Sequence, residues 1–157
     1  MGIEENKEVV KQYVERFGKG DSSVVDELTT DDFVFHALRH GGGDITEKEY
    51  LKQTNTGGHN AFSDYTLTTV DMVAEGDKVM CLSKRTGTHT GELQGIPATG
   101  NTVTIHRFWS FRVENGKIAE IWGMDDLLGQ FQQLDVLPST QDIWKSASKN
   151  NKSRDRK

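Results

Sequence analysis

The chain has 157 residues, 34% of them hydrophobic, and a formal net charge of −5. A chain of this length is expected to form one domain that buries about 70% of its unfolded surface. Residues 145–157 carry a charge of +5, which leaves −10 on residues 1–144. An acidic body disfavours nucleic acid as the main partner. No apolar run approaches the roughly 18 residues of a membrane span, so we expect no membrane partner.

The first residues and the cysteine usage bear on the compartment. The amino terminus is acidic and polar, unlike a secretory signal peptide. Cys81 is the one cysteine, so no intrachain disulfide can form, as is usual in a reducing compartment. We therefore expect a cytoplasmic protein. Because Cys81 lies in an apolar strand, we expect an inert core thiol; the alternative is a reactive thiol.

The first third of the chain predicts helices around one short strand. Residues 9–17 form an apolar stripe at helical spacing: Val9, Val10, Tyr13, Val14 and Phe17. A second, short helix is predicted over 21–28 and a strand over 33–36. A glycine-rich loop follows at 39–43, and a third helix is predicted over 46–55.

After residue 60 the hydrophobic pattern changes to the alternation typical of strands. Strands are predicted over 66–74, 78–90, 103–113 and 117–124, joined by short turns or loops. A final helix is expected to bury Leu127, Leu128, Phe131 and Leu134. The predicted class is α+β: a curved antiparallel sheet packed on three amino-terminal helices, with a short carboxy-terminal helix and a pocket inside the cone.

The chain divides into two parts by composition. Residues 1–144 are expected to form the single domain. Residues 145–157 are basic and lack large apolar side chains, so we expect a disordered, solvated tail.

Two adjacent carboxylates, Asp125 and Asp126, lie where the last strand gives way to the final helix. A carboxylate at the end of a buried strand is partly shielded from water, and its pKa can rise into the range of acid/base catalysis. The structural alternative is an Asp that caps the helix by accepting bonds from free backbone N–H groups. The local pattern leaves both interpretations open.

Three stretches carry a resemblance to a known family. They are the block Gly-Thr-His-Thr-Gly-Glu-Leu-Gln-Gly-Ile-Pro-Ala-Thr-Gly at 87–100, Gly-Lys-Ile-Ala-Glu-Ile-Trp at 116–122, and Asp126 with the Leu-Gly and Gln-Leu pairs within 128–134. The chain resembles the SnoaL-like polyketide cyclases, or ester cyclases, of the NTF2-like superfamily. The match covers roughly residues 5–138.

The resemblance implies a cone-shaped α+β barrel that is usually dimeric or higher and works without metal or cofactor, and we expect a homodimer. The best-known members close a ring by intramolecular aldol condensation, with an aspartate near the end of the last strand as acid/base. That aspartate corresponds to Asp126 in this chain. The implied substrate is a small hydrophobic carbonyl compound, and isomerase-type chemistry is equally compatible. Two alternatives stay open: a non-catalytic small-molecule binder and an epoxide-type hydrolase.

The turn between the last two strands decides which side chains share a face. A two-residue turn at 115–116 would place His106 opposite Asp125 and point Asp126 to the other face. A three-residue loop at 114–116 would place His106 diagonal to Asp126 on one face. We favour the three-residue loop, because the resemblance requires Asp126 to face inward. A one-residue slip in register reverses every face.

In the favoured register His106 assists Asp126 as a hydrogen-bonding partner. An Asp of ordinary pKa, about 3.9, is a weak base at neutral pH, and apolar neighbours would raise its pKa. The residues expected to contact substrate are His36, Tyr13, Phe17, Phe108, Trp122 and Met124. Tyr13 and Phe17 are equally compatible with an ordinary core position.

The remaining histidines and one tryptophan have simpler predicted roles. His36 and His40 are four residues apart, but a glycine loop rather than a helix follows, so the spacing does not predict a zinc site. His89 is expected to brace the loop of the 87–100 block, and His59 to lie at the surface. Trp109 is expected to pack on the sheet or to form a dimer contact.

Overall fold

The computed structural model describes residues 2–39 and 41–154, with side chains as far as residue 149. Its helices are α1 (Ile3–Gly18), α2 (Val24–Leu28), α3 (Lys48–Ala61), α4 (Leu127–Gln133) and α5 (Thr140–Arg154). Its strands are β1 (Thr29–Ala37), β2 (Asp44–Ile45), β3 (Phe62–Glu75), β4 (Lys78–His89), β5 (Thr102–Glu114) and β6 (Lys117–Asp125). The predicted α+β class is confirmed.

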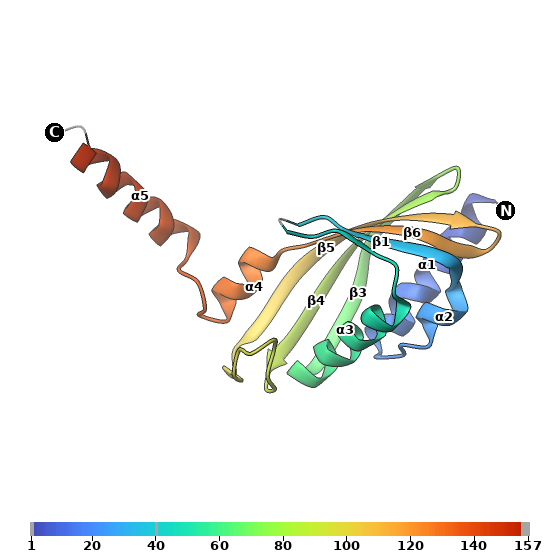
Figure 1. Ribbon diagram of the computed structural model, residues 1–157, viewed down its shortest axis with the longest axis horizontal. Coiled ribbons are helices and arrows are strands. Elements are labelled where there is room, and N and C mark those ends of the chain that lie inside the picture. Colours follow the sequence, from blue (N-terminus) through green and yellow to red (C-terminus); the bar gives the residue numbers. More distant parts are fainter. Residues whose placement is uncertain (1, 40, 155–157) are drawn as a thin grey trace.

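The strands form one curved sheet in the order β2-β1-β6-β5-β4-β3, and α1, α2 and α3 lie over one face of it (Figure 1). The sheet does not close, since β2 and β3 are its two edges. One prediction is wrong: β1 pairs with β6 in parallel, so the sheet is mixed. The chain reaches β6 from the far edge through α3, β3, β4 and β5, and such a long crossover permits a parallel pair.

Aromatic side chains from α1 and β5 form the centre of the core. Tyr13 stacks on Phe17 with ring centroids 5.6 Å apart, and Phe17 meets Trp109 edge-on at 6.1 Å. Phe111 is fully buried, and Trp109 is 5% exposed. The helical stripe therefore packs on the inner face of the sheet as predicted. Trp109 belongs to this core, which excludes the alternative of a dimer contact.

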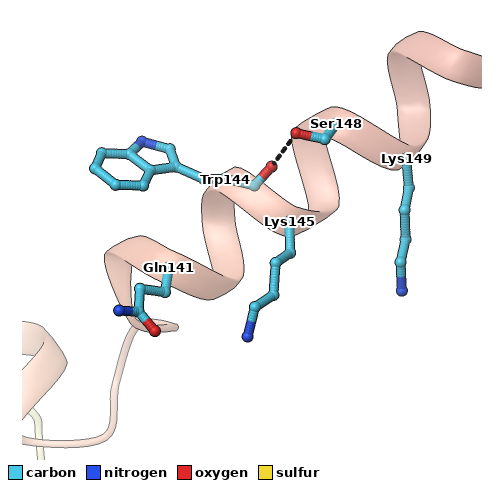
Figure 2. Close-up of a pocket in the computed structure, with 5 residues that line it drawn as sticks. All are labelled: Gln141, Trp144, Lys145, Ser148 and Lys149. Carbon is cyan, nitrogen blue, oxygen red and sulfur yellow. Dashed lines mark hydrogen bonds between the residues drawn. The ribbon is translucent and has the colours of Figure 1, made fainter.

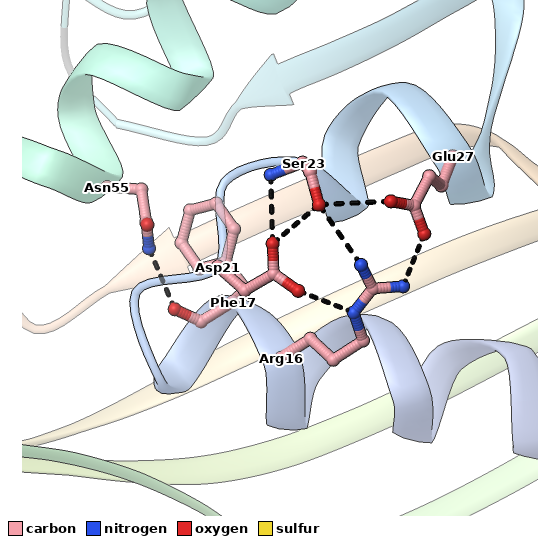
Figure 3. Close-up of polar contacts among 6 residues, drawn as sticks. All are labelled: Arg16, Phe17, Asp21, Ser23, Glu27 and Asn55. Carbon is pink, nitrogen blue, oxygen red and sulfur yellow. Dashed lines mark hydrogen bonds and ion pairs between the residues drawn. The ribbon is translucent and has the colours of Figure 1, made fainter.

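The turn between α1 and α2 is held by Arg16 (Figure 3). Its guanidinium donates to side chains of Asp21 (2.7 Å), Glu27 (2.6 Å) and Ser23 (3.1 Å). From α3, the buried Asn55 amide donates to the carbonyl oxygen of Phe17 at 2.8 Å. These bonds fix the three amino-terminal helices to one another over the sheet.

The β5–β6 hairpin has the two-residue turn, so the favoured three-residue loop is wrong. Asn115 and Gly116 both have positive φ, 49° and 80°, as a tight hairpin turn requires, and Glu114 pairs with Lys117. A bulge at Ala119 then shifts the register by one residue. Beyond the bulge Arg107 lies opposite Asp125. The bulge thereby turns Asp125 toward the inner face of the sheet.

Helix α5 (Thr140–Arg154) includes the described part of the basic segment 145–157, and the disorder expected for that segment stays a prediction. Helix α5 extends away from the rest of the chain (Figure 1) and begins after Ser139, whose hydroxyl accepts from the Asp142 N–H at 3.2 Å. Figure 2 shows one side of α5, where Trp144 is 67% exposed and its carbonyl accepts from Ser148 at 2.9 Å. Residues 155–157 lie outside the described part.

Two smaller predictions are confirmed. His89 is fully buried and its Nδ1 accepts from the Thr99 N–H at 3.2 Å, which braces the loop after β4. Cys81 is 1% exposed, and burial raises the pKa of its thiol. In the part of the chain that the structure describes, no helix combines the length and apolar character needed to cross a membrane.

Candidate active site

A row of polar side chains crosses the inner face of the sheet, beside its aromatic core. The register aligns Thr69 on β3, Ser83 on β4, Arg107 on β5 and Asp125 on β6. The next inner row toward the β5–β6 turn is Cys81, Trp109 and Gly123. The inner face therefore changes from apolar to polar within one row, and α4 follows directly from that end of β6.

Arg107 and Asp125 form a two-bond ion pair. Arg107 Nε donates to Asp125 Oδ1 at 2.8 Å, and Nη2 donates to Oδ2 at 2.9 Å. The Arg107 side chain is 13% exposed and that of Asp125 27%. Burial lowers the pKa of Arg107, but attraction to Asp125 and Tyr65 outweighs it, so the pKa is raised overall. Arg107 Nη1 is buried and finds no acceptor within the described chain.

A second arginine, Arg85, lies on β4 with its side chain on the same face. It is 7% exposed and donates through Nη2 to the Gln130 side chain of α4. Its guanidinium carbon is 4.9 Å from the ring centre of Phe62 and 5.9 Å from that of Tyr65. Burial and repulsion from Arg107 lower its pKa.

The floor of this site is aromatic. The guanidinium of Arg107 lies 5.1 Å from the Trp109 ring, and Tyr13 is 2% exposed beneath the same region. Burial raises the pKa of the Tyr13 hydroxyl, against the opposing effect of Arg107. The Arg107–Asp125 pair therefore lies over an apolar base formed by Trp109 and Tyr13.

A groove of about 700 Å³ opens beside the site, between α1, α3 and β3. Its lining is Glu15, Gly18, Lys19, His59 and the β3 segment 65–69. Tyr65 belongs to both features, since it lines the groove and also contacts Arg85. His59 is half-buried: it lines the groove and packs on Tyr65 at 4.1 Å, with its Nε2 covered. Tyr65 and Thr69 are therefore the residues that connect the groove to the inner polar row.

Asp126, the carboxylate singled out in the sequence, caps α4. Its Oδ1 accepts from the Gly129 N–H at 2.8 Å, which confirms the capping interpretation. A Cβ at position 129 would lie 2.2 Å from Asp126 Oδ2, so any larger residue there would displace the capping carboxylate. Asp126 is exposed, and its backbone N–H donates to the His106 carbonyl at 3.3 Å. Its catalytic role stays a prediction.

The structure divides the other predicted contact residues between the two faces of the sheet. Tyr13 and Phe17 lie in the inner core. The remaining ones lie on the outer face, which the amino-terminal helices leave uncovered: His36, His106, Phe108, Trp122 and Met124. Of these, Phe108 is 55% and Met124 52% exposed, and they pair across β5 and β6. Beyond the bulge His106, Phe108, Trp122 and Met124 share a face with position 126, as predicted, but it is the outer face, because Trp109 and Phe111 occupy the inner positions of β5.

His36 is held by contacts on the outer face. Its Nδ1 lies 2.7 Å from Asp44 and its Nε2 3.2 Å from Glu120. Its ring stacks on Trp122 at 4.8 Å. His40 lies outside the described residues.

The sequence analysis missed Arg85, Arg107 and Gln130 as site residues. A signal for Arg107 was present, because it shares the alternation of Val103, Ile105, Trp109 and Phe111 and must share their face. A charged residue in the buried phase of a strand needs a partner and marks a candidate site.

Comparison with known proteins identifies the family. The SnoaL-like polyketide cyclase family matches residues 7–134. The chain belongs to this family. Among solved structures this SnoaL-like protein is similar to AclR, a predicted hydroxylase from Streptomyces galilaeus (TM-score 0.81, 23% identity, 99% of this chain and 97% of that one). IdmH, a predicted polyketide cyclase from Streptomyces antibioticus, has a TM-score of 0.73 and 28% identity, covering 83% and 99%.

A third neighbour, a predicted SnoaL-like polyketide cyclase from Jannaschia sp. CCS1, has a TM-score of 0.76 and 21% identity, covering 87% of this chain and 95% of that one. No curated protein matches the SnoaL-like chain in sequence. The family supports a cyclase type of role on a small molecule. Because a hydroxylase and cyclases share the fold, the reaction must be argued from the site.

Proposed function

We propose that this SnoaL-like protein catalyses cofactor-free acid/base chemistry, aldol ring closure or isomerisation, on a small carbonyl compound bound at the inner site. The observation that carries the proposal is the Arg107–Asp125 pair. It presents an inward carboxylate beside a buried guanidinium N–H that has no acceptor in the described chain. A base and an oxyanion donor side by side are what enolisation requires.

The proposed reaction begins with proton transfer. The Asp125 carboxylate removes a proton from the carbon next to a substrate carbonyl, and the negative charge that develops on the carbonyl oxygen is stabilised by Arg107 Nη1–H. Each Asp125 oxygen keeps a lone pair after accepting from Arg107, so it can take the proton. For ring closure the enolate carbon bonds to a second carbonyl carbon of the same substrate, and Asp125 returns its proton to the new alkoxide.

Asp126 remains the catalytic residue predicted from the resemblance, and His106 its partner in the predicted register. Asp125, one residue away, faces inward and is the alternative base. Two matched variants distinguish the two aspartates. Asp125→Asn removes the base but keeps the shape. Asp126→Asn is the control, because Asn caps a helix as well as Asp does.

The test is solvent exchange of a carbon acid. Methyl (ortho-acetylphenyl)acetate is incubated with the protein in D₂O, and deuterium uptake next to the ester carbonyl is followed by NMR. We expect Asp125→Asn to lower the enzymatic exchange rate by about 100-fold or more, and Asp126→Asn to leave it within a few fold. Loss of exchange in Asp126→Asn alone would refute the assignment and favour the one from the resemblance. Thermal unfolding of both variants checks the fold.

We also propose a homodimer formed through the outer face of the sheet. Trp109, the residue first considered for a dimer contact, is buried in the core. The outer face instead presents exposed apolar side chains at Met80, Phe108 and Met124. Phe108→Glu is expected to convert a dimer to a monomer in light scattering, and a wild-type monomer would refute the proposal. A cytoplasmic location stays a prediction.

A further inference from the structure

The inner site contains more buried positive charge than its own residues neutralise. Arg85 and Arg107 lie on neighbouring strands, one inner position apart along β4 and β5. Asp125 makes both of its bonds to Arg107. Within the described chain no carboxylate forms an ion pair with Arg85. The site therefore has two guanidiniums for one carboxylate.

The partners of Arg85 are all neutral. They are the side-chain oxygen of Gln130 and the ring faces of Phe62 and Tyr65. A guanidinium that is 7% exposed has lost most of its hydration, and neutral partners repay only part of that cost. The lowered pKa of Arg85, caused by burial and by Arg107, agrees with this imbalance. An anion bound beside Arg85 would neutralise its charge and remove this imbalance.

The structural alternative is that Arg85 only fastens α4 to the sheet through Gln130. A neutral Gln or Met could do this without burying a charge, and arginine is retained most often where its planar fork recognises a carboxylate or phosphate. The nearby Arg107 Nη1, which is also buried without an acceptor, provides a second donor at the same site.

We propose that Arg85 binds a carboxylate group of the substrate, so that the compound taken by this site is a keto acid rather than a neutral keto ester. The inference rests on the proposed function, because it takes the inner site as the place where substrate binds. It adds a division of labour: Arg85 anchors the acid group, while Arg107 and Asp125 face the reacting carbonyl.

The experiment compares two probes that differ in one group, (ortho-acetylphenyl)acetate and its methyl ester, each titrated by calorimetry. In the wild type the acid is expected to bind at least 10-fold more tightly than the ester, equivalent to about 1.4 kcal/mol. Arg85→Gln should remove that preference. Lys84→Gln, a charge change at the neighbouring exposed position on the outer face, should leave it intact.

Further arms keep the test decisive. Arg85→Lys retains the charge without the fork and should keep part of the preference, whether or not Arg85→Gln folds. Equal binding of acid and ester by the wild type would overturn the proposal, and so would inorganic phosphate that competes as strongly as the acid. An acid preference without deuterium exchange would refute the proposed chemistry alone. Exchange without an acid preference would refute the inference alone.

Discussion

Removal of Asp125 would leave the Arg107 guanidinium buried without its counter-ion. The Arg107 side chain is 13% exposed, so water could replace only part of what the two bonds of 2.8 and 2.9 Å supply. Breaking a buried pair by deleting one partner costs about 3–5 kcal/mol. Because 27% of the Asp125 side chain is already exposed, we expect Asp125→Ala to lower the free energy of unfolding by about 3 kcal/mol, the low end of that range.

Replacing both members with apolar side chains should behave differently. The double variant Arg107→Leu/Asp125→Leu removes both charges, so we expect a stability within about 1 kcal/mol of wild type. Urea unfolding, followed by tryptophan fluorescence, measures the stability of the single and the double variant. With a denaturant slope of about 2 kcal/mol/M, the Asp125→Ala midpoint should fall by about 1.5 M. An Asp125→Ala variant as stable as wild type, or a double variant no better than the single one, would refute the claim that the pair is buried and coupled.

Three further predictions test the surrounding structure. Cys81 should react with a thiol reagent in the folded protein at least 100-fold more slowly than in urea, because it is buried and its pKa is raised; rapid native labelling would contradict this. Glu120→Gln should cost about 1 kcal/mol at neutral pH. Burial alone would raise the pKa of Glu120, but bonds such as that from Arg112 lower it overall, so its contribution is lost as the pH falls from about 5 through the lowered value. Urea midpoints measured against pH should show the stability difference between Glu120→Gln and the wild type disappearing over that pH range; a difference that stays constant would contradict this prediction. Gly123→Ala should lower the unfolding free energy by about 1–3 kcal/mol, since the new Cβ would lie 2.7 Å from the Phe35 ring; an unchanged melting temperature would exclude that close contact.

Periodicity predicted the parts of the fold that depend on local pattern. The α1 stripe, the long strands β4 and β5 and the buried Cys81 follow from alternation and helical spacing alone. The order of the elements also placed a strand-to-helix switch at 125–126, where the structure has one. The parallel pairing of β1 with β6 depends on contacts distant in sequence, and no local pattern encodes it.

The candidate site was the harder part, for one physical reason. The extra residue Ala119 shifts the β5–β6 register by one and exchanges the faces of the β6 residues that follow it, which puts Asp125 rather than Asp126 on the inner face. Sequence reasoning grouped Asp126 with the right neighbours on β5 and β6, but it assigned that group to the inner face because it took Asp126 as inward. The alternation around Arg107 was visible and would have placed that charge inside.

The most direct test of the inner site is a crystal structure with methyl (ortho-acetylphenyl)acetate bound. We expect the ligand on the inner face of the sheet, with a carbonyl oxygen within hydrogen-bond distance of Arg107 Nη1 and an enolisable carbon facing the Asp125 carboxylate. A ligand bound instead against Asp126 and His106, with Arg107 Nη1 still lacking an acceptor, would contradict the account.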